Sequence, residues 1–131
     1  NISSNLPNRG SVFAIRQDHV NVDLFFIGTE FGVHFSADAG ASWRQIETGL
    51  PTIAVRDLEI QRRENDLVLA TFGRGFYVLD NYSALREYNA KTFSEESYLF
   101  PIKPALVFFE ASPLGYGKNG FMGASYYAAP N

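Results

Sequence analysis

Residues 12–27 read VFAIRQDHVNVDLFFI, and residues 55–70 read VRDLEIQRRENDLVLA. The second stretch aligns with the first without a gap, at a shift of 43 residues from position 12 to position 55. At the same shift of 43 residues, GVHF at 32–35 matches GFYV at 75–78. The chain therefore contains an internal repeat, and this repeat decides the fold.

Each repeat predicts short β-strands, because β-branched and aromatic residues dominate and Gly or Asn interrupts them every few positions. The second strand of each repeat is apolar on both faces, which predicts burial between two neighbouring sheets. A repeat of about 40 to 50 residues built from short strands is typical of β-propeller blades. The fold is therefore predicted to be all-β, with two blades of a propeller. The expected strands are residues 12–16, 24–29, 32–36, 43–46, 56–61, 67–71 and 76–80.

The sequence changes character from residue 81 onward. Residues 82–88 are expected to form either a final strand or a short helical turn, and residues 112–130 show no clear periodicity. We predict propeller blades over residues 1–90 and an extended linker or strap toward a following domain over residues 91–131. Because two blades cannot bury their faces alone, the sequence is expected to belong to a longer protein, whose remaining blades are its partners.

Composition narrows the classes of partner and cofactor. The chain is 46% hydrophobic and 19% charged, which is typical of a globular protein with a buried core. Its net charge of -3 and 11 scattered Lys and Arg residues argue against nucleic acid or an anionic membrane as a partner. No apolar run approaches the roughly 20 residues that span a bilayer, so membrane insertion is not expected. Without cysteine, and with His19 and His34 in separate elements, the sequence predicts neither a metal site nor a cofactor.

The segment SADAGASW at 36–43 matches the pattern S-x-D-x-G-x-x-W at every defined position. In such a turn Asp38 can accept hydrogen bonds from backbone N–H groups, Gly40 supplies a positive φ, and Trp43 can cover the hairpin. The motif resembles the Asp box, or BNR repeat, of sialidases, xyloglucan-cleaving glycosidases and sortilin-type receptor propellers. The resemblance implies a structural role for Ser36, Asp38, Gly40 and Trp43, at the far end of the propeller from the ligand site.

The resemblance extends to the last blades of bacterial secreted proteins described as glycosyl-hydrolase-like or sortilin-like. It covers roughly residues 5–87 and implies the C-terminal blades of a protein that is extracellular or in the cell envelope. The chain departs from the family pattern at Phe72, where His is more usual, and the second repeat has no Asp box after Asp80. The matching segments are GTEFGV at 28–33, GLP at 49–51, VRDL at 55–58 and TFGRGFYVLD at 71–80.

Arg56 and Asp57 open the innermost strand of the second predicted blade, where side chains point toward the central channel. A carboxylate beside a guanidinium can bind a polar ligand or act as an acid or base, and it can equally form an ion pair that orders neighbouring blades. Glycoside hydrolysis needs a second carboxylate about 5 to 10 Å away. Glu30, in a turn at the same predicted end, is the nearest one. Asp57 and Glu30 are therefore the candidate catalytic residues.

Phe72 and Arg74 lie in a glycine-containing turn and, together with Arg56, form a predicted ligand-binding rim. The set Arg16, Arg56 and Arg74 does not predict a sialidase, because these arginines come from two neighbouring blades and no nucleophilic Tyr with a partner Glu can be placed. The predicted function is a non-catalytic or scaffold propeller that binds a protein or a glycan at this rim. The alternatives are a glycoside hydrolase whose catalytic residues lie mainly in other blades, and an assembly subunit that docks through residues 99–131.

Overall fold

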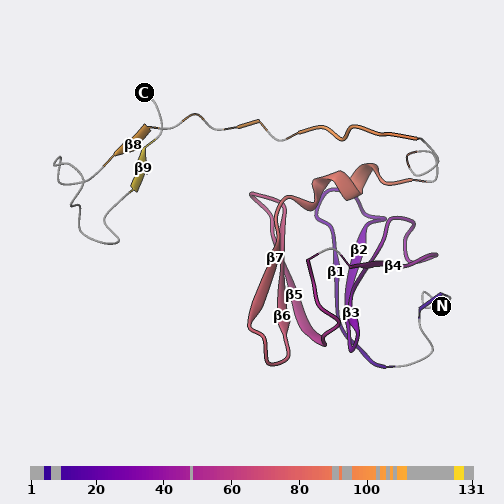
Figure 1. Cartoon of the computed structure of the whole chain (residues 1–131). Coiled ribbons are helices and arrows are strands. Elements are labelled where there is room, and N and C mark those ends of the chain that lie inside the picture. The colour runs from indigo at the N-terminus through magenta and orange to yellow at the C-terminus, as the bar shows by residue number, and fades with distance from the viewer. Residues whose placement is uncertain are drawn as a thin grey trace. The chain divides into compact units, whose positions relative to one another are not determined.

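The computed structural model divides the chain into two compact units, residues 1–100 and residues 101–131. The first unit contains two antiparallel sheets, and the second contains one pair of strands (Figure 1). The residues that the structure describes are 5–6, 10–47, 49–89, 92, 96–102, 104–105, 107, 109–111 and 126–128.

The two sheets of the first unit follow one another along the chain. The first sheet has the order β1-β2-β3-β4 and the second the order β5-β6-β7, so each is a simple meander. All seven strands lie within one residue of their predicted bounds, which confirms the all-β prediction. The strands are β1 (Val12–Gln17), β2 (Phe25–Thr29), β3 (Gly32–Ser36), β4 (Arg44–Ile46), β5 (Val55–Gln61), β6 (Asp66–Thr71) and β7 (Phe76–Leu79).

The 43-residue repeat is visible in the backbone of both sheets. β1 and β5 each carry a register shift after their first residue, which places Phe13 and Arg56 in the extra position of a β-bulge. The residue after β2 or β6 then hydrogen-bonds to the residue before β1 or β5. These matching bonds run from Glu30 N–H to Ser11 O (3.0 Å) and from Phe72 N–H to Ala54 O (2.9 Å).

The strand pairing corrects the predicted alignment of β2 with β6. Arg16 pairs with Phe26, and Glu59 pairs with Val68, so Phe26 corresponds to Val68 rather than to Leu69 as the ungapped alignment predicts. The β1–β2 turn is one residue longer than the β5–β6 turn, and the β2–β3 turn is one residue shorter than the β6–β7 turn. The two differences cancel, which hides them in the sequence. Because side chains alternate along a strand, the one-residue error exchanges the two faces of β6.

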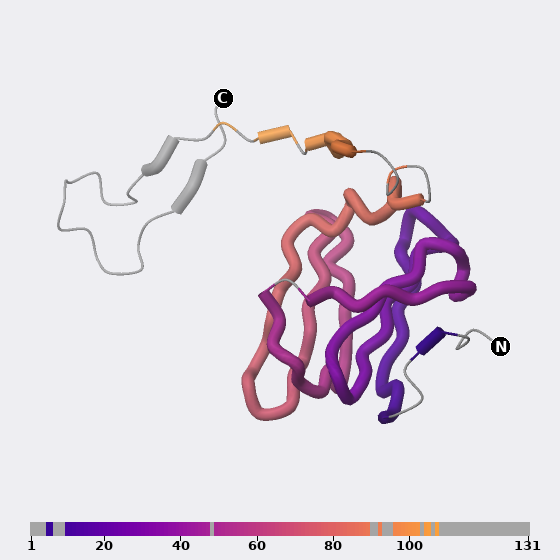
Figure 2. Tube along the Cα trace, turned by 45° about the vertical axis from the view of Figure 1, so that its right-hand side comes forward, coloured from indigo at the N-terminus to yellow at the C-terminus, as the bar shows by residue number. Residues whose placement is uncertain are grey.

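The two sheets pack face to face, with β1 and β2 against β5 (Figure 2). Gly28 permits this approach, because a Cβ atom there would lie only 2.6 Å from the carbonyl oxygen of Val55. The buried core between the sheets consists of Leu24, Phe26, Val33 and Phe35 from the first sheet and its turn, Val55, Leu58, Ile60, Leu67 and Leu69 from the second, and Tyr82.

The prediction that both central strands are buried on both faces is correct for β2 and wrong for β6. In β2 every residue after Phe25 is buried. In β6 only Leu67 and Leu69 are buried, because they face the first sheet. The alternate positions lie on the face of the second sheet that points away from the first sheet, and Phe76 and Val78 on the same face are 76% and 54% exposed.

A 3-10 helix, η1 (Tyr82–Glu87), follows β7, so the helical alternative for this segment is the correct one. The second unit contains an antiparallel pair, β8 (Phe109–Ala111) with β9 (Tyr126–Ala128), within the region where the sequence predicts only an extended segment. Each of these strands has only three residues, which is too short for the alternation of apolar and polar residues that would predict a strand.

Candidate functional site

Hydrogen bonds place the predicted site residues at two opposite ends of the paired sheets. At the strand-start end, defined by residues 10–13, 29–32, 54–56 and 71–76, the β2–β3 and β6–β7 turns bond to the residues before β1 and β5. At the other end, the η1 end, Ala39 N–H donates to Asp23 O (2.9 Å), which joins the turn holding Asp38 to the β1–β2 turn. Glu30 and Phe72 therefore lie at the strand-start end, and Asp38 lies at the η1 end.

Arg56 lies between two aromatic rings at the strand-start end. Its guanidinium carbon is 4.1 Å from the centre of the Phe13 ring and 5.2 Å from that of Phe72. Both Phe13 and Arg56 occupy bulge positions, and bulges redirect side chains out of the regular alternation of a strand. The two rings hold the flat guanidinium through cation–π contacts, although Arg56 as a whole is exposed to solvent. The structure thus joins two predicted rim residues, Arg56 and Phe72, through Phe13, which sequence reasoning missed.

Arg16 is the arginine that pairs with Asp57. Its Nη2 lies 3.2 Å from Asp57 Oδ1 and its Nε lies 3.2 Å from Glu59 Oε2. Asp57 therefore takes part in an ion pair between neighbouring sheets, which was one of the predicted alternatives, but its partner is Arg16 and not the adjacent Arg56, because the bulge turns Arg56 toward the rings. The carboxylates are 63% and 72% exposed, so water screens these pairs and each contributes about 1 kcal/mol or less. They join β1 to β5 and form a charged surface along these two strands.

Glu30 and Arg74 are exposed in the two turns of the strand-start end. Gly10 approaches the first of them closely, since a Cβ at Gly10 would lie 3.1 Å from Glu30 Oε2. No hydrogen bond or ion pair joins Glu30 or Arg74 to Asp57 in the described part of the chain, and a catalytic role for Asp57 with Glu30 stays a prediction. Glu59 is the carboxylate that shares a partner with Asp57, and the sequence signal for it was its position two residues further along β5.

A cavity of about 400 Å³ opens beside the β2–β3 turn, within the size range of about 300 to 1,000 Å³ typical of small-ligand sites. His34 is 5% exposed, and its Nδ1 has no hydrogen-bond partner among the residues that the structure describes. Burial lowers the pKa of His34, so the imidazole is neutral at physiological pH. The lining residues are Leu6, Gly10, Ser11, Val12, Thr29, Phe31, His34, Gln45, Glu47, Leu50 and Thr52.

The turn at residues 36–43 has the hydrogen bonds that its motif predicts. Asp38 Oδ1 accepts from Ser42 N–H (2.7 Å) and from the Ser36 hydroxyl (2.7 Å), and Gly40 has φ of 86°. Burial alone would raise the pKa of Asp38, but the hydrogen bonds from Ser42, Ser36 and the Ala41 backbone outweigh it and lower the pKa. All of the carboxylate's described contacts close its own turn. We assign the turn a structural role.

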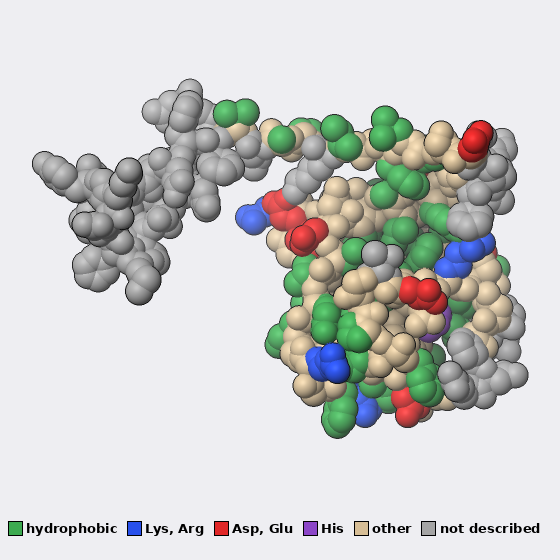
Figure 3. All heavy atoms as spheres, in the orientation of Figure 1, with side chains coloured by type: hydrophobic (Ala, Val, Ile, Leu, Met, Phe, Trp, Pro, Cys, Tyr) green, Lys and Arg blue, Asp and Glu red, His purple; other side chains and the backbone are tan. Residues whose placement is uncertain are grey.

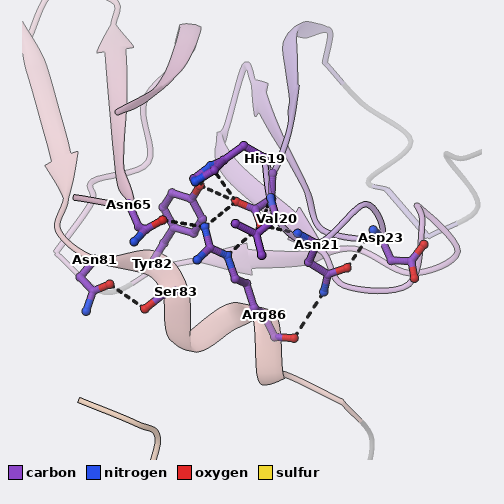
Figure 4. Close-up of polar contacts among 10 residues, drawn as sticks. His19, Val20, Asn21, Asp23, Asn65, Asn81, Tyr82, Ser83 and Arg86 are labelled. Atoms are coloured by element: carbon purple, nitrogen blue, oxygen red, sulfur yellow. Dashed lines mark hydrogen bonds and ion pairs between the residues drawn. The ribbon is translucent and has the colours of Figure 1, made fainter. Parts of the chain in front are cut away.

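A buried polar cluster joins η1 to the β1–β2 turn (Figure 4). The side chain of Asp18 is fully buried, and it accepts hydrogen bonds from Arg86 Nε (2.8 Å), Arg86 Nη2 (2.9 Å) and the Tyr82 hydroxyl (2.6 Å). Arg86 Nη2 also donates to Asn65 Oδ1 (2.7 Å). We call Asp18, Asn65, Tyr82 and Arg86 the clasp. Sequence reasoning missed it, because its members are up to 68 residues apart and no local pattern connects them.

The electrostatics of the clasp fix the charge of its members. Burial alone would raise the pKa of Asp18, but hydrogen bonds from Arg86, from Asn21 N–H and from Tyr82 outweigh burial and hold it well below its usual range. The Asp18 hydrogen bond raises the pKa of Arg86, and burial, followed by that carboxylate, raises the pKa of Tyr82. The cluster is therefore an ion pair with a neutral tyrosine. Its donors and acceptors are directed at one another, which makes it an anchor for η1.

The described residues contain no group of three or more His, Asp or Glu side chains placed to hold a metal ion. Within the same residues, no helix has the length and apolar character needed to cross a membrane. No model of a known protein family matches the chain, and neither do the curated proteins or the solved structures with which it was compared.

Proposed function

We propose that the chain forms two neighbouring blades of a β-propeller, and that this propeller is a non-catalytic binding scaffold. The observation that carries the proposal is the way in which the repeat is stacked. The face of the second sheet that meets the first sheet contains Leu58 and Leu69, which correspond to Ile15 and Ile27 on the outer face of the first sheet. The sheets therefore stack in one sense, front to back, which is the arrangement that repeats around a propeller.

The proposed ligand site is the strand-start end. Support comes from the exposed stack of Arg56 between Phe13 and Phe72, and from the cavity of about 400 Å³ beside the β2–β3 turn at the same end. The stacked guanidinium is held in place, and no acceptor from the described part of the chain is bonded to its N–H groups, which can therefore donate to a ligand, while the rings offer apolar contact. A protein or a glycan with acceptor groups fits this surface. On the resemblance of the Asp box, the proposed setting is the bacterial cell envelope or the extracellular space, with the other blades supplied by a longer protein.

Binding to a glycan array and to purified envelope proteins tests this assignment. Arg56→Ala and Phe72→Ala are expected to weaken the same interactions, because each removes part of one stack. Val22→Ala is the matched control, since Val22 is an exposed apolar residue of the β1–β2 turn at the η1 end. Equal losses from Val22→Ala and Arg56→Ala would show that the strand-start end is not the binding surface.

A glycoside hydrolase is the second candidate, and one observation favours it. Asp57 and Glu59 are two residues apart on β5, so their Cα atoms are about 7 Å apart and their side chains lie on the same side of the strand, where both carboxylates pair with Arg16. Glycosidases use two carboxylates placed side by side, about 5 to 10 Å apart. Turnover of a glycan panel that is abolished by Asp57→Asn and by Glu59→Gln, but not by the exposed Asp80→Asn, would select this function over the scaffold.

A further inference from the structure

The cavity beside the β2–β3 turn lies on the outer face of the first sheet. Val33 and Phe35 of β3 pack against the second sheet, so His34 between them points to the outer face. Four parts of the chain bound this cavity: β3 with β4, the β2–β3 turn, the residues before β1, and the connection from β4 to β5. On the side of the first unit that carries β4, apolar, acidic and histidine side chains are all visible (Figure 3). We call this space the outer cavity.

Phe31 lines the outer cavity and is held in place by its neighbours. Its N–H donates to the Thr29 hydroxyl (3.2 Å), and its carbonyl oxygen accepts from Gln45 Nε2 (3.1 Å). Gly10 lies against the ring, since a Cβ atom there would be 2.6 Å from Phe31 Cε2. The ring therefore has a fixed position, and its electron-rich face can attract the partly positive C–H groups of a ligand.

The segment that carries Leu6 is a second fixed wall of the outer cavity. The Oδ1 of Asn5 accepts from Trp43 N–H (2.8 Å), and its Nδ2 donates to Trp43 O (3.0 Å). This pair of bonds ties the segment to the backbone just before β4. Because both walls are ordered without a ligand, binding in the cavity does not have to order them.

The polar groups of the outer cavity are suited to accept hydrogen bonds. His34 Nδ1 is buried without a partner among the described residues, and an unpaired buried polar group is costly. A rotation about the Cβ–Cγ bond, a broad torsion in histidine, presents a ring nitrogen to the cavity. Burial lowers the pKa of His34, so the ring is neutral and keeps one acceptor nitrogen. Glu47 adds a carboxylate, and the described lining residues include no Lys or Arg. A suitable ligand therefore brings donors and no negative charge.

We propose that the outer cavity binds a single ring of an uncharged sugar. The hydroxyl groups of such a ring donate to His34 and Glu47, while its C–H face lies on Phe31. The volume of about 400 Å³ is near the lower end of the range for small-ligand sites, which suits a single ring. The outer cavity and the Arg56 stack both include residues at the start of β1. The inference rests on the proposed binding function and selects a glycan as the ligand.

Titration of the full chain with glucose, galactose, mannose and N-acetylglucosamine, followed by the imidazole nitrogen NMR signals, tests the inference. The chain has two histidines, and His19→Gln assigns their signals. We expect at least one of these sugars to shift the His34 signals and to leave those of His19, at the η1 end, unchanged. Glucuronic acid should bind more weakly, because Glu47 repels its carboxylate. A His34 signal that none of the four uncharged sugars shifts overturns the inference.

Two variants remove contacts of the outer cavity. Phe31→Ala and Glu47→Gln are each expected to weaken sugar binding about tenfold, through loss of the ring contact or of a charge-assisted hydrogen bond. The matched controls are Phe76→Ala, at a residue that is 76% exposed on the second sheet, and Asp80→Asn, directly after β7. Circular dichroism and unchanged His34 signals in the free variants establish that the fold and the cavity are intact. Equal losses from the variants and their controls overturn the inference.

Binding of the same variants to a glycan array separates this inference from the proposed function. Binding that Arg56→Ala abolishes, but that Phe31→Ala and Glu47→Gln leave intact, overturns the outer cavity as the sugar site and keeps the proposed function. Binding that Phe31→Ala and Glu47→Gln weaken, but that Arg56→Ala leaves unchanged, supports the inference and contradicts the Arg56 stack as the ligand site.

Discussion

Arg86→Ala is expected to be among the most destabilising single changes outside the apolar core. The substitution removes two hydrogen bonds to Asp18 and one to Asn65. It leaves a carboxylate with no exposed side-chain surface, whose remaining partners are the Tyr82 hydroxyl, His19 Nδ1 at 3.4 Å and the backbone N–H groups of Val20 and Asn21. Removing one partner of a buried ion pair costs about 3 to 5 kcal/mol. Since the Arg86 side chain is itself 18% exposed, water can reach the space it vacates, so we expect about 3 kcal/mol.

Urea unfolding followed by circular dichroism measures this loss, and the midpoint should fall without a change in slope. A loss of 3 kcal/mol corresponds to roughly 10 °C in Tm for a chain of this size. Arg63→Ala is the matched control, because Arg63 is 83% exposed and its ion pair with Glu64 contributes about 1 kcal/mol or less. If both variants unfold at the same midpoint, the clasp does not stabilise the fold and the reasoning fails.

Three other changes test separate parts of the structure. Because the folded-state pKa of Asp18 is lowered, its contribution to stability is present above the unfolded pKa of about 4 and is lost as pH falls below it. Urea titrations at neutral and acidic pH should therefore show a smaller drop in Arg86→Ala than in the original chain; an identical drop would contradict this. Trp43→Ala, at a residue that is 5% exposed, should cost about 3 kcal/mol by thermal unfolding, and an unchanged Tm would show that the turn does not need the ring. Gly28→Ala should cost about 1 to 3 kcal/mol, because its Cβ would press on Val55 O and force the sheets apart; full stability would mean that the sheets can separate freely.

The strands could be predicted from the sequence because each one is bounded by turn residues and has a consistent pattern of apolar positions. The register of β6 could not. The turns on either side of β6 differ in length by one residue, in opposite senses, from the turns on either side of β2. The two differences cancel before Gly75, so the ungapped alignment appears continuous although it matches Phe26 with Leu69, which lies on the other face of the sheet. Only the pairing of Glu59 with Val68 reveals the shift.

For the candidate site, the sequence identified residues more reliably than partners. Arg56 and Phe72 were predicted at one end, and they are in contact. An ion pair between neighbouring sheets was among the alternatives for Asp57, but its partner, Arg16 of the other sheet, was not identified. Contacts between sheets depend on how two strands lie side by side, and a bulge of one residue redirects the side chains. The repeat could have indicated these contacts, since Phe13 and Arg16 lie 43 residues before their partners Arg56 and Glu59 and occupy equivalent positions in the two sheets.

The clasp also determines how the first unit would respond to a pulling force. β7 is an edge strand that pairs only with β6 within its sheet, and a force applied to the chain beyond it would peel such a strand away one hydrogen bond at a time. η1 takes up that force before β7 does, because its residues Arg86 and Tyr82 are hydrogen-bonded to Asp18 in the β1–β2 turn of the first sheet. The load then passes across two sheets at once and strains the buried ion pair before any strand. A force applied beyond residue 89 therefore does not act directly on the hydrogen bonds between the strands of the second sheet.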